Sequence, residues 1–466
     1  MKFLIVVPDR DLSQNMYCLE QAIELAFLGE TVFLLDLANL SLNTHPLKIK
    51  DYLIKLTHRN RIHNEVPKIA KKFGFNLIIL DKSLMLPIND YSSGDLENTF
   101  ARALASKFAY ITGGRNTQES ELPLKIASAE RQTFNSAYWA VRNSLISLAI
   151  DQVITVNGRF VIDSATVLAA KDSEIPVRLL EVGSQIKSNF HLYSISPHNI
   201  PERWLLQDSA WEVAGENAVA MAEAGLNLKM QSLRPGGGSW KENFTRDFNI
   251  SNGPMLKLAV FFPNSDVEFP VFQDFNGPSS FNGDQTEAFL SFCSLAFKEG
   301  YRVAVRVHPP GVNGKRSAEL DDSLWASLCE KSGAQMFASN SGIDSYDLMN
   351  KSDLNVTYCS SIGIESILLG HPTLILGQTD YSHYVPECCA FSLPEIEVKL
   401  KNPLIIPERS KLYPWGYWFA FGGMDPKHFY VDQDGKLFLG DLQFDQLRLW
   451  YKIPHALKKR IVSILK

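Results

Sequence analysis

The sequence predicts an α/β fold built from two doubly wound parallel sheets. Short apolar runs typical of buried strands alternate with amphipathic stretches typical of helices, and this alternation occurs twice along the chain. It lapses around residues 235–254, which contain a Pro-Gly-Gly-Gly-Ser run and end in Asn-Gly-Pro. Because strands that alternate with helices form parallel sheets covered on both faces, the two series predict two α/β domains joined by a linker.

The first series begins at the N-terminus. A strand at residues 3–7 stops at Pro8, a helix at 17–28 ends before Gly29, and a second apolar run at 31–35 ends at Asp36. The same reasoning predicts the elements that follow: helices at 48–72, 122–150 and 163–170, and strands at 76–80, 152–156 and 177–180.

The second series follows the linker. Its predicted strands are residues 257–262, 302–307, 354–358 and 373–376, and its predicted helices are residues 286–298, 320–331 and 363–369. A basic stretch at 443–466 predicts a terminal helix. We therefore expect domains at 1–234 and 255–400, a linker at 235–254 and a C-terminal extension at 401–466.

The composition is that of a globular protein. Hydrophobic residues make up 45% of the 466 residues and charged residues 21%, which excludes a disordered chain. The formal net charge of −5 offers no whole-chain attraction to nucleic acid. The six cysteines are dispersed without metal-ligand spacing, so we expect them to be reduced and structural. The opening apolar run is too short for a signal peptide or a membrane span, which predicts a cytoplasmic protein.

Hydroxyl side chains lie between the strand at 354–358 and the helix that follows it. Ser360 and Ser361 are candidates for binding a phosphate there, and Glu365 is a candidate for contacting ribose hydroxyls. The alternative is that the serines cap the helix and that Glu365 stabilises its positive end.

Polar residues also follow two other strands of the second series. His308 comes after the strand at 302–307, where it would contact phosphate or base, although an ordinary loop histidine is the alternative. Asn264 and Ser265 follow the strand at 257–262, and residues of these types also form ordinary turns.

In the first domain, two polar groups are expected at one sheet edge. Asn157 and Arg159 follow one strand and Glu181 ends the next, so their side chains should converge. A carboxylate at such an edge is a candidate general base. A capping or solvated glutamate is the alternative for Glu181, and the rival bases are Asp163, His191 and His198.

The order of these motifs resembles that of capsule-polysaccharide-type glycosyltransferases of the GT-B fold, including bacterial polysialyltransferases and related capsule enzymes. The motifs are Asn157-Gly158-Arg159, Leu180-Glu181-Val182-Gly183, Phe262-Pro263-Asn264-Ser265-Asp266, Arg306-Val307-His308-Pro309, Ser345-Tyr346-Asp347-Leu348 and Ser360-Ser361-Ile362-Gly363-Ile364-Glu365. Where related sequences often have a His-Glu-Arg-Gly-like string, this chain has Leu-Glu-Val-Gly.

The resemblance implies two Rossmann-like domains facing across a cleft, with an acceptor-side first domain and a second domain that holds a nucleotide-sugar donor. It places His308 and Ser360 or Ser361 at the donor phosphate and Glu365 at the ribose. It also makes Glu181 the base that deprotonates the acceptor hydroxyl. The donor-binding set is Ser360, Ser361, Gly363, Glu365, Asn264 and Ser265, and the acceptor-side set is Asn157 and Arg159.

The expected function is transfer of a sugar from a nucleotide-sugar to a hydroxyl of a surface or capsular glycan or glycolipid. The donor is a substrate, so no cofactor is expected, and no Asp-x-Asp string after a strand predicts a metal site. The basic C-terminal stretch is a candidate for peripheral contact with the inner face of the membrane, with a solvated helix as the alternative. Other readings are a nucleotide-sugar epimerase, a polyol-phosphate transferase or a noncatalytic glycan- or nucleotide-binding subunit. Donor identity, linkage stereochemistry and oligomeric state stay open.

Overall fold

The computed structural model divides the chain into two compact units. Unit 1 comprises Met1–Leu104, Ser120–Pro197 and Gly423–Lys466, and unit 2 comprises Ala105–Glu119 and His198–Gly422. The structure describes residues 1–8, 12–37, 40, 66–81, 83–87, 95–112, 121–183, 189–232, 257–264, 280–308, 315–431, 437–439 and 442–444.

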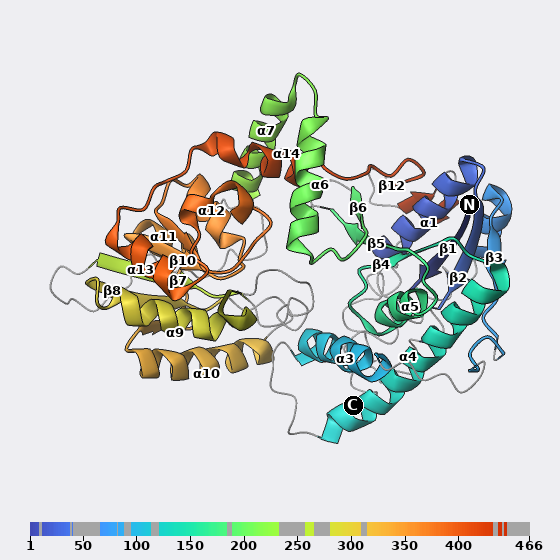
Figure 1. The fold of residues 1–466 in the computed structure, drawn as a ribbon, viewed down its shortest axis with the longest axis horizontal. Helices are drawn as coiled ribbons and strands as arrows, with labels where there is room; N and C mark the ends of the chain where they lie inside the picture. The colour runs from blue at the N-terminus through green and yellow to red at the C-terminus, as the bar shows by residue number, and fades with distance from the viewer. Residues whose placement is uncertain are drawn as a thin grey trace, which may run out of the picture. The chain divides into compact units, whose positions relative to one another are not determined.

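Unit 1 contains a six-stranded sheet (Figure 1). Its strands, in the spatial order β3-β2-β1-β4-β5-β6, are β3 (Asn76–Ile78), β2 (Thr31–Asp36), β1 (Lys2–Val7), β4 (Gln152–Val156), β5 (Val177–Val182) and β6 (Phe190–Tyr193). All neighbouring pairs are parallel except β5 and β6. The order reverses between β1 and β4, which is the arrangement of a doubly wound Rossmann-like sheet.

Helices cover both faces of this sheet because side chains alternate along its strands. The helices are α1 (Leu12–Phe27), α3 (Leu96–Thr112), α4 (Glu121–Leu148) and α5 (Val161–Lys171). Ile5 of β1 belongs to a buried cluster with Leu19 of α1. The next residue back, Leu4, belongs to a second cluster with Phe134 of α4.

Unit 2 contains a second sheet, which is parallel throughout. Its strands, in the spatial order β11-β10-β7-β8-β9, are β11 (Thr373–Ile375), β10 (Leu354–Thr357), β7 (Lys257–Phe262), β8 (Tyr301–Arg306) and β9 (Gln335–Phe337). The helices that accompany it are α9 (Gln285–Ala296), α10 (Lys315–Ser332), α11 (Ser345–Asn350), α12 (Ile362–Leu368) and α13 (Leu393–Lys401). The predicted fold class, α/β with two Rossmann-like doubly wound units, is confirmed.

Three further helices of unit 2 pack together: α6 (Ile200–Glu212), α7 (Ala218–Ser232) and α14 (Tyr413–Phe421) (Figure 1). The backbones of α7 and α14 meet at two glycines. A Cβ atom added at Gly225 would lie 2.0 Å from the carbonyl oxygen of Gly416, so only glycine allows this approach. Trp415 and Trp418 of α14 are buried, and these aromatic side chains therefore pack in the core.

The C-terminal part of unit 1 forms a small antiparallel sheet of β12 (Phe429–Val431), β13 (Leu437–Leu439) and β14 (Leu442–Phe444). The buried carboxylate of Glu20 on α1 anchors it by accepting the backbone N–H groups of Lys427, His428 and Phe429.

This division differs from the predicted domain boundaries in three places. The part of α3 from Ala105 onward, inside the predicted first domain, belongs to unit 2. The segment before the predicted linker, which contains α6 and α7, packs in unit 2 because α7 meets α14 so closely. The described residues from Gly423 to Phe444 pack in unit 1, where Glu20 holds the backbone of Lys427 to Phe429. The predicted linker at 235–254 lies outside the described residues. The predicted terminal helix at 443–466 also lies outside them, except that residues 443 and 444 belong to β14.

Candidate functional site

Three neighbouring strands of unit 2 end at the same edge of the sheet. β10 pairs with β7 and β7 pairs with β8, all in parallel. Asn264 follows β7, His308 follows β8 and Ser360 follows β10. The topology therefore brings these predicted residues to one edge, where open α/β sheets bind ligands.

Asn264 connects the end of β7 to the loop after β10. Its side-chain amide donates to the carbonyl oxygen of Cys359 at 3.0 Å, and its backbone N–H donates to the side-chain oxygen of the buried Gln285 at 3.1 Å. Asn264 thus holds the chain just before Ser360 in place. Ser265 lies outside the described residues.

Close packing fixes the loop that contains the two serines. The hydroxyl of Tyr381 donates to the carbonyl oxygen of Ser360 at 2.5 Å. A Cβ atom at Gly363 would lie 2.3 Å from that same hydroxyl and 2.9 Å from Cγ2 of Thr357, so this position has room only for glycine. Gly363 therefore has a role in packing, whereas the sequence motif predicted a role in donor binding.

The two serine hydroxyls lie at the start of α12. Oγ of Ser360 accepts the N–H of Ile362 at 3.4 Å, a long and weak capping contact. Ser361 makes no capping bond with its side chain and is exposed. The capping alternative for the serines therefore accounts for Ser360 only weakly and for Ser361 not at all.

Glu365 is buried within unit 2, with 6% of its surface exposed. Its Oε1 atom lies 2.7 Å from Nζ of Lys229 on α7, and its Oε2 atom accepts the hydroxyl of Tyr346 at 2.9 Å. Burial first, and then the neighbouring charge of Glu365, raises the pKa of Tyr346 well above its ordinary value, so this hydroxyl stays protonated and donates. Both carboxylate oxygens of Glu365, the residue expected to contact the ribose, thus have protein partners.

A buried arginine, two residues before His308, holds the backbone at the end of β8. The guanidinium of Arg306 donates to the carbonyl oxygens of Ile343, Val307 and Ala338 at 3.1, 2.6 and 2.8 Å. Burial lowers the pKa of Arg306 to about 10, and the group remains charged at neutral pH. His308 itself is exposed.

In unit 1, the structure brings the predicted acceptor-side residue Asn157 together with the predicted base Glu181. Asn157 has a φ of 47° and Gly158 a φ of 79°, so the chain turns sharply after β4. This turn directs the side-chain amide of Asn157 to the carboxylate of Glu181, which also accepts the N–H of Val182 at 3.2 Å. Arg159 instead places its guanidinium over the ring of Phe160, 4.7 Å from the centroid.

The three rival bases occupy different surroundings. Asp163 is 1% exposed in the first turn of α5. His191 lies directly opposite Glu181 in the pairing of β5 with β6. His198 belongs to unit 2.

Among the described residues, one group of carboxylates and histidine has metal-ligand geometry. The ligand atoms of Glu20, Glu24 and His428 lie within 4.8 Å of one another in unit 1. Glu20 already accepts three backbone N–H groups, and Nζ of Lys427 lies 2.7 Å from Glu24. These contacts anchor the C-terminal sheet to α1. None of the predicted site residues belongs to this group.

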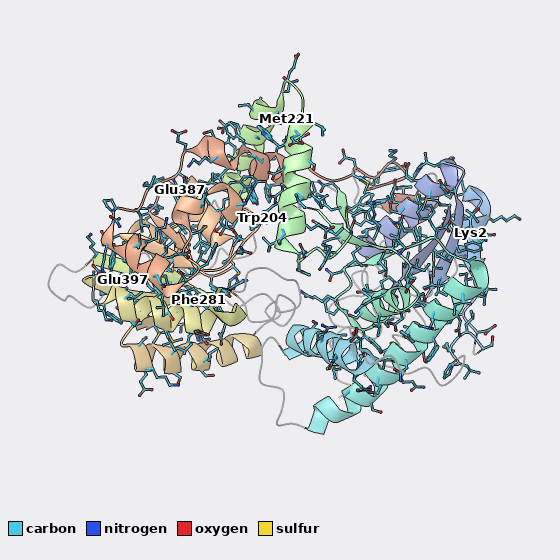
Figure 2. All side chains as sticks on the ribbon, in the orientation of Figure 1. Lys2, Trp204, Met221, Phe281, Glu387 and Glu397 are labelled. Carbon is cyan, nitrogen blue, oxygen red and sulfur yellow. The ribbon has the colours of Figure 1, made fainter. Side chains whose placement is uncertain are left out.

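A hollow of about 330 Å³ lies in unit 2 beside α6. Trp204, labelled in Figure 2, contributes to its wall and stacks on His383 with ring centroids 5.1 Å apart. None of the predicted site residues lines it. No helix in the described part of the chain is long and apolar enough to cross a membrane.

Comparison with known proteins gives matches to solved structures only, because no family model and no curated protein matches this chain. The KpsC β-Kdo 2,7 transferase of Thermosulfurimonas dismutans is 14% identical with a TM-score of 0.38, and the match covers 70% of this chain and 90% of that one. The β-Kdo 2,4 transferase from the same organism is also 14% identical, with a TM-score of 0.36 and coverage of 57% and 79%.

A UDP-GlcNAc 2-epimerase of Neisseria meningitidis is likewise 14% identical, with a TM-score of 0.25 and coverage of 91% and 95%. The chain is thus similar to glycosyltransferases and to UDP-GlcNAc 2-epimerases. The strand orders of the two sheets identify both units as Rossmann-like.

Proposed function

We propose that this protein is a metal-independent glycosyltransferase of the GT-B type, which transfers a sugar from a nucleotide-sugar to a hydroxyl of a surface or capsular glycan. The observation that carries the proposal is the shared edge of β10, β7 and β8, because three separate strands bring Ser360, Asn264 and His308 to it. A sheet edge of this kind is where doubly wound folds bind nucleotides.

The donor would bind to unit 2. The exposed hydroxyl of Ser361 and the imidazole of His308 would contact the donor phosphates. Negative charge develops on the nucleotide as its bond to the sugar breaks, and fixed donor groups at that point lower the barrier. Arg306 supports this role by holding the backbone at Val307, directly before His308.

The acceptor would meet Glu181 of unit 1. In this role the carboxylate of Glu181 takes the proton of the acceptor hydroxyl. The hydroxyl oxygen of the acceptor attacks the anomeric carbon of the donor sugar at the same time. The proton moves to Glu181, the bond from sugar to phosphate breaks, and the nucleotide departs with the bonding electrons. Asn157 supports this role because its amide orients the carboxylate.

The test is a thermal-shift screen of the full chain with nucleoside mono- and diphosphates. A ligand that binds only the native state raises the melting temperature. At a ligand concentration of 100 times its Kd, the free energy of unfolding rises by about 2.7 kcal/mol. We expect one nucleotide class to raise it in the wild-type protein and to do so less in the His308→Ala variant.

The matched control is His371→Ala. His371 precedes β11 and therefore lies at the opposite edge of the sheet, where its ring contacts Asn350 at 2.9 Å. This variant should respond to the nucleotide as the wild type does. If no nucleotide binds, or if both variants lose binding equally, the proposed donor site is wrong.

A further inference from the structure

The ion pair of Lys229 with Glu365 lies beside the proposed donor site. Nζ of Lys229 is 2.7 Å from Oε1 of Glu365, and the two side chains are 14% and 8% exposed. Lys229 comes from α7 and Glu365 from α12, and both helices belong to unit 2. The ammonium also lies 6.0 Å from the ring centroid of Phe419 on α14.

This ammonium is adjacent to the exposed serine of the donor site. Oγ of Ser361 donates to Oε1 of Glu365 at 3.4 Å, and that is the same oxygen that Lys229 contacts. The hydroxyl and the ammonium therefore flank one carboxylate oxygen. A phosphate that reaches Ser361 comes close to a lysine that no sequence motif marks.

Glu365 is held from its other side by Tyr346. The Tyr346 hydroxyl donates to Oε2 at 2.9 Å, and N-capping by Asp344 fixes the start of the short helix that contains Tyr346. With one oxygen bound to Tyr346 and the other to Lys229, the carboxylate orients the ammonium. This arrangement leaves Glu365 poorly placed to receive ribose hydroxyls.

Buried ion pairs add little net stability, because desolvation of both charges offsets their attraction. An ammonium that is already desolvated and oriented, however, binds an anion strongly, since it has little further hydration to lose. Its three N–H donors allow it to contact a carboxylate and a phosphate oxygen together.

We propose that Lys229 binds the diphosphate of the donor and that Glu365, supported by Tyr346, is the positioning residue that orients it. The proposal rests on the proposed function and adds a binding residue to its donor site. It replaces the ribose contact expected for Glu365 with an indirect role through Lys229.

The variant that tests the proposal is the double substitution Lys229→Met and Glu365→Gln. Lys229→Met alone would leave a buried carboxylate without its cation and would mix loss of folding with loss of binding. The double variant removes both charges, keeps the side-chain volumes and leaves an oxygen that accepts from Tyr346.

The control is a second ion pair of α7, in which Nε of Arg409 lies 2.9 Å from Glu223. The double substitution Arg409→Met and Glu223→Gln removes that pair in the same way. Calorimetric titration of the full chain would use UDP, CDP, GDP, ADP, the matching nucleosides and inorganic pyrophosphate.

We expect the Lys229/Glu365 double variant to bind the preferred diphosphate and pyrophosphate about 10 to 100 times more weakly, the loss typical of one hydrogen bond to a charged group. Binding of the nucleoside should change less than threefold, and the Arg409/Glu223 variant should bind like the wild type. A folded Lys229/Glu365 variant with wild-type diphosphate affinity would overturn the assignment. A nucleoside affinity that falls as much as the diphosphate affinity would instead return Glu365 to the ribose.

A measurement on the wild-type protein keeps the test valid if the double variant does not fold. Modification of Lys229 by an amine-reactive ester, followed by mass spectrometry, should be slowed by pyrophosphate and not by the nucleoside. Unchanged modification in the presence of bound pyrophosphate would refute the role of Lys229. Failure of the wild-type chain to bind any nucleotide would refute the proposed function instead.

Discussion

The side-chain amide of Asn157 donates to the carboxylate of Glu181, across two neighbouring parallel strands of unit 1. The positive φ of Asn157 turns the chain sharply at the end of β4, and this turn directs the side chain toward Glu181. Asparagine tolerates such backbone angles better than most residues. One residue thus supplies both the turn and the hydrogen bond that orients the proposed base.

We expect Glu181→Gln to lower turnover by about 10² to 10⁴, the usual contribution of a positioned base, and to leave donor affinity nearly unchanged. The acidic limb of the pH–rate profile should flatten, because glutamine does not titrate. Steady-state kinetics over a range of pH would measure both effects. If Glu181→Gln keeps its rate while Asp163→Asn or His191→Ala abolishes it in a folded protein, the base has been misassigned.

Gly363→Ala tests the packing beneath the serine loop. The added methyl group would lie 2.3 Å from the hydroxyl of Tyr381 and 2.9 Å from Cγ2 of Thr357. We expect the free energy of unfolding to fall by about 1 to 3 kcal/mol, as overpacking usually costs, in denaturant titrations. Adding Tyr381→Phe should recover part of this loss through removal of the clashing oxygen. Equal losses with and without the tyrosine hydroxyl would show that the contact does not control packing here.

The anchor of the C-terminal sheet should weaken in acid. The hydrogen bond from Lys427 lowers the pKa of Glu24 below its usual 4.5, and that from His428 acts in the same direction. A lowered folded pKa stabilises the native state above the unfolded pKa, and this contribution is lost as the pH falls through the folded value. For a partly exposed pair we expect about 1 kcal/mol or less.

Hydrogen exchange of the β12 amides between pH 6 and pH 3 would measure this effect. Burial raises the pKa of Glu20, so its effect on stability has the opposite pH dependence to that of Glu24. Comparison with the Glu24→Gln variant therefore isolates the contribution of Glu24. Its exchange should depend less on pH than that of the wild type. An identical dependence in both proteins would mean that the Glu24 contacts do not hold the sheet.

Transfer should survive removal of divalent cations. The proposed mechanism offsets charge on the departing nucleotide with His308, Ser361 and Lys229, so EDTA should leave the rate of donor turnover unchanged within about twofold. Activity abolished by EDTA and restored by Mg²⁺ or Mn²⁺ would show that a metal supplies this charge. The group of Glu20, Glu24 and His428 would then need to be tested by substitution.

The sequence predicts the two sheets well because buried parallel strands are short apolar runs bounded by turn residues. It also places Asn264, His308 and Ser360 after strands, and a parallel topology brings strand ends together. The partners of Glu365 are not predictable in this way. Lys229 reaches it from a helix far away in the sequence, and only tertiary packing determines that contact.

The domain boundaries show the same limit. A run of proline and glycine marks a break in periodicity, but it does not say which unit the preceding helices join. That depends on the contact of Gly225 with Gly416, two residues with no local signal of partnership. The strands β12 to β14 have three residues each, too few for a pattern to indicate them.

The most direct test of the proposed activity is the fate of a nucleotide-sugar incubated with the full chain, using sugars of the nucleotide class that binds best. Chromatography would follow three species: intact donor, epimerised donor and released nucleotide. We predict slow release of the nucleotide by the wild-type protein, at least about 10²-fold slower release by His308→Ala, and wild-type release by His371→Ala. Tight binding without release, or an epimerised nucleotide-sugar with its nucleotide still attached, would contradict the assignment as a glycosyltransferase.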